Sequence, residues 1–64
     1  MIKQAAIKDG RTLRLEVVGG VNDSERVVLQ GIVTILACVL EDNRLLRPFA
    51  ELLVYMMETL NRLR

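Results

Sequence analysis

The chain has 64 residues, a formal net charge of +1 and one cysteine, and these features exclude several classes of protein. A chain of this length has room for a single small domain, which buries only about 60 % of its unfolded surface and is marginally stable alone. Cys38 has no second cysteine to pair with, and the absence of histidine leaves too few ligands for a structural zinc site. Oligomerisation is the remaining common source of stability for so small a domain.

Charge and hydropathy argue against nucleic acid and membranes as partners. Nine Lys/Arg against eight Asp/Glu create no strong field toward an anionic surface. The opening segment, residues 1–10, carries charges and lacks an apolar core, so we expect no secretory leader. The longest nearly apolar run, residues 27–40, is shorter than the roughly 20 residues that a membrane-spanning helix needs. Together with the unpaired cysteine, these features indicate a cytoplasmic protein.

Residues 1–18 predict a β-hairpin with its turn at Asp9-Gly10. This dipeptide favours a two-residue type I′ turn, which needs a positive φ at both positions. Such a turn pairs residues whose numbers add up to 19, which predicts an ion pair between Lys3 and Glu16. In this register the core-facing side of the hairpin carries Ile2, Ala6, Leu13, Leu15 and Val17.

Gly19-Gly20 ends the hairpin, and a first helix is predicted over residues 23–41. The polar tract before it supplies first-turn acids and helix caps, with Asn22 and Glu25 at the spacing of a capping box. The segment that follows, VVLQGIVTILACVL, is apolar on nearly every side. A helix of this kind must be covered nearly all round. We expect Cys38, in its middle, to be a buried and unreactive thiol.

A second helix is predicted over residues 47–63, with Pro48 in its first turn, where the missing N–H costs nothing. Apolar residues recur along it at spacings of three and four, as in a coiled-coil seam. The seam consists of Phe49, Leu53, Met56, Leu60 and Leu63, and a second apolar row consists of Ala50, Val54 and Met57.

These elements predict one α+β domain over residues 1–64, in which a β-hairpin is followed by two α-helices (ββαα). Two helices on a two-stranded sheet leave one sheet edge open and one helix flank bare, and a second copy of the chain would cover both. We therefore expect homo-oligomerisation, as a dimer or a larger assembly, to complete the fold. The candidate residues for the interface between copies are Leu36, Val39, Leu53, Met56 and Leu60.

Nothing in the sequence builds an active site, so we expect no enzymatic activity, no cofactor and no metal. Cys38 has no histidine to act as its base, and its neighbours are apolar. Tyr55 is one of only two aromatic residues, and the methionines beside it make an adaptable apolar surface. The candidate residues for binding another protein are Tyr55, Met57, Arg11 and Arg14.

The basic residues of the hairpin leave an alternative open, a dimeric DNA-binding transcriptional regulator. Ribbon-helix-helix repressors insert a two-stranded ribbon into the major groove. In this chain Thr12, Arg14 and Glu16 would then read the bases. A nearly neutral charge, together with a first helix that is too long and too apolar for that family, disfavours nucleic acid as the partner.

The whole pattern resembles the short, mostly uncharacterised proteins encoded by bacteriophages and prophages. The shared features are an opening MIK strand, a short turn, a second strand that ends at glycine, and two compact helices. The resemblance implies a phage-derived protein in the cytoplasm of a bacterial host. Our favoured hypothesis is a non-enzymatic, homo-oligomeric interaction protein that binds and blocks another protein, such as a host defence or regulatory factor.

Overall fold

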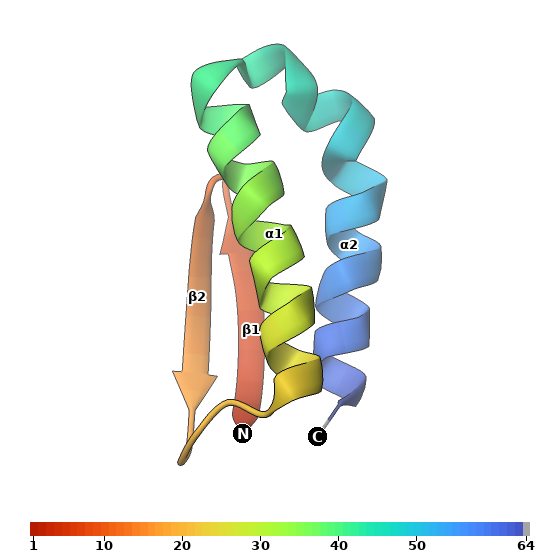
Figure 1. Ribbon diagram of the computed structural model, residues 1–64. Helices are drawn as coiled ribbons and strands as arrows, with labels where there is room; N and C mark the ends of the chain where they lie inside the picture. The colour runs from red at the N-terminus through yellow and green to blue at the C-terminus, as the bar shows by residue number, and fades with distance from the viewer. Residues whose placement is uncertain (64) are drawn as a thin grey trace.

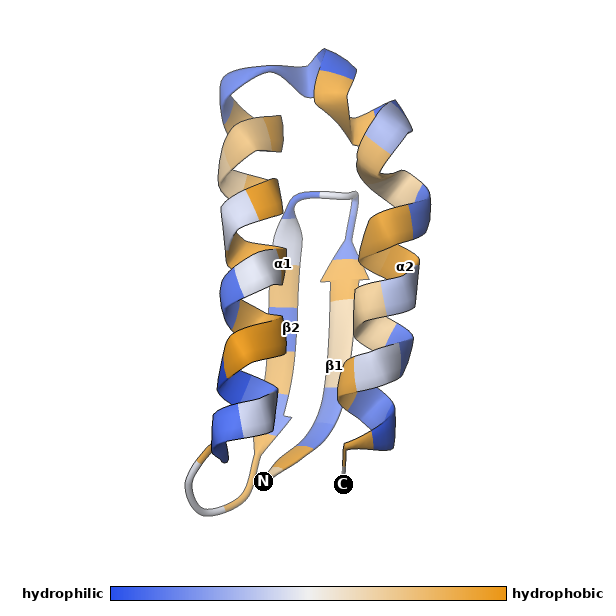
Figure 2. Ribbon diagram, turned by 45° about the vertical axis from the view of Figure 1, so that its right-hand side comes forward, coloured by the Kyte–Doolittle hydropathy of each residue, from blue (hydrophilic) through white to orange (hydrophobic). Residues whose placement is uncertain are grey.

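The computed structural model describes residues 1–63 and confirms the predicted ββαα order. Its elements are the strands β1 (Ile2–Lys8) and β2 (Thr12–Val17), the helix α1 (Asp23–Glu41), the short 3-10 helix η1 (Asn43–Leu45) and the helix α2 (Leu46–Arg62). In Figure 1 and in Figure 2, β1 lies between β2 and α2, and α1 packs against that row. The first helix has the predicted bounds, and the second begins and ends one residue earlier than predicted.

The hairpin has the predicted turn but not the predicted register. Asp9 and Gly10 both have positive φ, 55° and 69°, and the N–H of Arg11 donates to the carbonyl of Lys8. From Lys8 to Gln4, however, paired residue numbers add up to 20, so that Ala5 lies opposite Leu15. The predicted ion pair of Lys3 with Glu16 is therefore wrong, because Glu16 lies opposite Gln4.

Two irregularities produce this register, and burial explains them. One extra residue, Arg11, follows the turn on β2, and an irregularity between Ile2 and Gln4 on β1 restores the predicted pairing of Ile2 with Val17. The shift places Ala5 and Ile7 on the same face as the leucines of β2, whereas the register expected from the turn alone would have placed Ala6 and Gln4 there. Bulges absorb the conflict between turn chemistry and the apolar pattern.

The start of α1 is fixed by the predicted capping box. The side chain of Asn22 accepts from the N–H of Glu25 at 2.8 Å, and the carboxylate of Glu25 accepts from the N–H of Asn22 at 3.0 Å. The second carboxylate oxygen of Glu25 accepts from the N–H of Ile2 at 2.6 Å. These backbone donors hold the pKa of Glu25 below its ordinary value, with Asn22 as the larger cause and Ile2 as the next.

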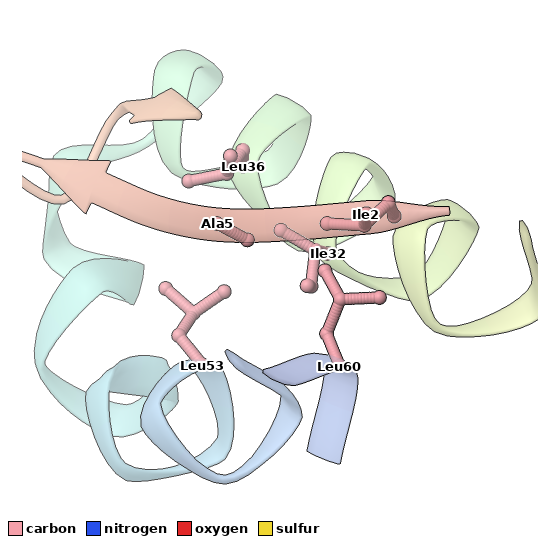
Figure 3. Close-up of a cluster of buried hydrophobic side chains, with 6 residues drawn as sticks. All are labelled: Ile2, Ala5, Ile32, Leu36, Leu53 and Leu60. Atoms are coloured by element: carbon pink, nitrogen blue, oxygen red, sulfur yellow. The ribbon is translucent and has the colours of Figure 1, made fainter. Parts of the chain in front are cut away.

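A single apolar cluster lies where β1 meets the two helices. Figure 3 shows its six buried side chains converging from β1, α1 and α2. The cluster consists of Ile2, Ala5, Ile32, Leu36, Leu53 and Leu60. No residue of β2 belongs to it, because β2 lies at the far side of β1 from α2.

Candidate protein-binding surfaces

An apolar groove of about 400 Å³ runs between β1 and α2. Small residues of β1 form one wall, and the second apolar row of α2 forms the other. Its lining includes Ala5, Ala6, Ile7, Ala50, Val54 and Met57. Val54 is 58 % exposed, so part of this wall is open to a partner. Concave apolar sites with a few polar groups are typical of small-molecule pockets, and apolar grooves also bind the apolar face of a partner's helix.

Glu58 and Asn61 are the polar side chains that line this groove, and Asn61 is unusual. Its side-chain Oδ1 atom is buried and has no hydrogen-bond partner among the described residues, although Asn61 lines the groove. A buried acceptor without a donor is costly, typically about 1–3 kcal/mol. Because this oxygen has almost no accessible surface, a partner could donate to it only after the Asn61 side chain turns toward the groove. Sequence reasoning missed Asn61, because an amide near the end of a helix is ordinary until its surroundings are known.

The edge of β2 is open, whereas α2 lies alongside the edge of β1, with the groove between them. Val18, which directly follows β2, directs its N–H toward Met1 and donates to its carbonyl at 2.9 Å. Backbone groups alternate in direction along an antiparallel strand. The N–H and C=O groups of Leu13, Leu15 and Val17 therefore point away from β1, toward the open edge.

Apolar side chains accompany this open edge. Leu15 and Val17 are each 41 % exposed, although they belong to the core-facing side of the sheet. On α1, Val33 is 50 % exposed. Gly31 of the same helix faces Met56 of α2, and Val33 points about 200° round the helix axis from Gly31. Since α2 lies on the opposite side of the molecule from β2, Val33 faces the same side as β2.

Most of the predicted interface residues are used within one chain. Leu36, Leu53 and Leu60 belong to the core, and Val39 is completely buried. They have at most 6 % of their surface left for a second copy, so their assignment to an interface between copies is corrected. The seam of α2 packs against its own chain because the hairpin and α1 suffice to cover it. Met56 alone stays partly accessible, in a shallow hollow between α1 and α2.

The four predicted partner-binding residues do not form one surface. Met57 is half-buried and lines the β1–α2 groove, and Arg11 follows Gly10 at one end of it. Tyr55 is 61 % exposed on another side of α2. Arg14 is exposed on the face of the sheet turned away from the core, opposite Ala6.

One expectation about α1 needs correction. Cys38 is exposed and not buried, because it lies outside the stripe of α1 that meets the sheet and α2. Much of the apolar surface of α1 is thus uncovered in one chain, including Val27, Val33 and Leu40.

Within residues 1–63, neither helix has the combination of length and hydropathy that a membrane span requires. No protein-family model, curated protein or solved structure shows a significant match to this chain.

Proposed function

We propose that this chain is a non-enzymatic interaction protein that works as a homo-oligomer and binds another protein in the β1–α2 groove. The observation that carries this proposal is the groove itself, with its apolar walls and its two polar lining residues, Glu58 and Asn61. The matching partner segment presents an apolar side chain to the walls and an N–H donor to the carboxylate of Glu58. Occupation of the groove would block that segment of the partner by steric exclusion.

The accessible surface supports the homo-oligomeric part of the proposal. The chain exposes 4602 Å², whereas a monomer of 7.3 kDa exposes about 4,200 Å² on average. The exposed surface includes large apolar side chains of β2, α1 and α2. If the chain is phage-derived, its target would be a defence or regulatory protein in the host cytoplasm.

Photo-crosslinking from two matched positions tests the groove. A photoreactive residue replaces Val54, which lines the groove, or Tyr55, which is similarly exposed but lies outside it. We expect a discrete covalent adduct with one bacterial protein from position 54 only. An added Met57→Lys substitution, which places a charge in the groove, should abolish that adduct. Equal labelling from both positions, or labelling from position 55 alone, would exclude the groove as the binding site.

A DNA-binding regulator is the second candidate, favoured by one observation. Thr12, Arg14 and Glu16 are exposed together on the uncovered face of the sheet, as that function requires. A duplex-DNA titration by fluorescence anisotropy at low salt tests it. Binding that weakens steeply with salt and is lost in Arg14→Ala would support this function, and no binding at low salt would exclude it.

A further inference from the structure

We propose that two copies of this chain associate through β2, edge to edge and antiparallel, with Leu15 opposite Leu15 of the second copy. This inference specifies the homo-oligomeric part of the proposed function and does not depend on the β1–α2 groove. The result would be a continuous four-stranded sheet with a twofold axis at Leu15.

The first argument is that β2 has the open sheet edge of the described chain. The other edge, that of β1, lies alongside α2. Proteins usually protect an open edge with proline, a bulge or inward-pointing charges. Between Thr12 and Val17 there is no proline, and the irregular positions of the hairpin fall outside this stretch. The edge is therefore ready to pair.

The second argument is the register that the backbone allows. Leu13, Leu15 and Val17 direct their N–H and C=O groups outward, so these odd-numbered residues must lie opposite odd-numbered residues of the second strand. The paired numbers must then add up to an even value. Three registers near the middle of β2 meet this condition. In each of them the twofold axis passes through one residue, which is Arg14, Leu15 or Glu16.

The third argument is charge, which selects one of these registers. Pairing about Arg14 places Arg14 opposite itself, and pairing about Glu16 places Glu16 opposite itself. Pairing about Leu15 instead places Arg14 of each copy opposite Glu16 of the other, twice by symmetry. Opposite charges across a strand pair are stabilising and like charges are destabilising.

The fourth argument is the apolar complementarity of the same register. It places Leu13 opposite Val17, and Leu15 opposite Leu15, on the face that is covered by α1. Leu15 and Val17 are 41 % exposed in one chain, and the second copy would shelter them. One register thus satisfies the backbone, the charges and the apolar side chains together.

A charge-swap experiment tests the proposal on the full chain. Within the chain Arg14 lies opposite Ala6, and Glu16 lies opposite Gln4, so both positions can change charge without disturbing a charged partner in the hairpin. The variants are Arg14→Glu, Glu16→Arg and the double variant with both changes. Sedimentation equilibrium over a dilution series from about 1 µM to 1 mM gives the dimer dissociation constant of each.

We expect the wild-type chain to be a dimer and each single variant to dissociate about tenfold or more readily, because each places like charges opposite each other twice. The double variant should regain wild-type association, because it restores both pairs in reverse. A wild-type monomer throughout the series, or a double variant as weak as the single variants, would overturn the proposal. A third result would also overturn it: all variants keep the wild-type mass, while Arg14→Glu and the double variant lose binding to duplex DNA. That result would assign Arg14 to nucleic-acid binding.

A cysteine trap measures the register directly. Leu15→Cys, in a background with Cys38→Ser, places the two thiols opposite each other in a pair with Cα atoms about 5.5 Å apart, within the range for a disulfide. Mild oxidation should link two chains, whereas Val54→Cys in the same background should stay unlinked. Equal linkage at both positions would show non-specific contact and overturn the register. Since neither measurement uses a second protein, failure here leaves the groove proposal to its own test.

Discussion

The N–H of Ile2 donates to Oε2 of Glu25 at 2.6 Å, and this bond ties the start of β1 to the first turn of α1. Both residues are completely buried. The bond spans 23 residues of sequence and fixes how the hairpin meets the helix. The capping carboxylate of Glu25 thus has a second role, because it also positions β1, which forms one wall of the β1–α2 groove.

Glu25→Ala should therefore destabilise the chain strongly. The substitution leaves the N–H groups of Ile2 and Asn22 without their acceptor, and the first of these donors is buried. We expect the melting temperature to fall by about 5 °C or more, measured by circular dichroism. Glu51→Ala, at an exposed position of α2, is the control and should change the melting temperature little. Equal shifts in both variants would contradict the role assigned to Glu25.

The same bonds predict a loss of stability in acid. The folded pKa of Glu25 lies below its ordinary value of 4.5, so its carboxylate stabilises the fold above that pH. This contribution is lost as the pH falls through the lowered folded pKa. Urea unfolding of the wild type and of Glu25→Gln, from pH 7 to about pH 3, should show a difference that shrinks below about pH 4.5. The Arg44 side chain also lowers the pKa of Asp42. Asp42 is present in both the wild type and the variant, so its contribution to the pH dependence cancels in the difference. A difference that is constant with pH would refute this account.

Adjacent alanines in β1 test the register of the hairpin. Ala5 is buried in the core, and Ala6 is exposed, whereas the register expected from a two-residue turn would bury Ala6. Ala5→Asp should cost several kcal/mol, because it buries an unpaired charge. Ala6→Asp should change the free energy of unfolding by only about 0.5 kcal/mol. The free energy of unfolding of each variant is measured by chemical unfolding. A larger loss in Ala6→Asp than in Ala5→Asp would support the register expected from the two-residue turn.

Alanine substitutions at two glycines with nearly equal φ distinguish the effect of backbone strain from that of packing. Gly10 and Gly19 have φ of 69° and 70°, so alanine at either position costs roughly 1–2 kcal/mol of conformational energy. A Cβ at Gly10 would also lie 2.5 Å from Cδ1 of Leu46, whereas a Cβ at Gly19 meets nothing within 4 Å. Gly10→Ala should therefore destabilise the chain more than Gly19→Ala. Equal losses would mean that the hairpin tip does not contact the start of α2.

Features that depend on near neighbours in the chain follow from the order of the amino acids alone. Asp9-Gly10 specifies its turn through φ, and Asn22 with Glu25 specifies the start of α1 through reciprocal hydrogen bonds. Both were predicted correctly because each involves residues at most three positions apart. The seam of α2 was likewise predicted from its spacing, and its Leu53 and Leu60 are core residues.

Which apolar surfaces the chain covers for itself depends instead on how its strands and helices pack. Only the packing of α1 and α2 against β1 shows that Leu53 and Leu60 are used internally, and that Cys38 and the edge of β2 are left outside. The hairpin register was decided in the same way, since burial of Ala5 and Ile7 outweighed the pairing that the turn alone favours. The physical reason is that burial depends on segments distant in sequence, whereas turns and caps depend on a few adjacent residues.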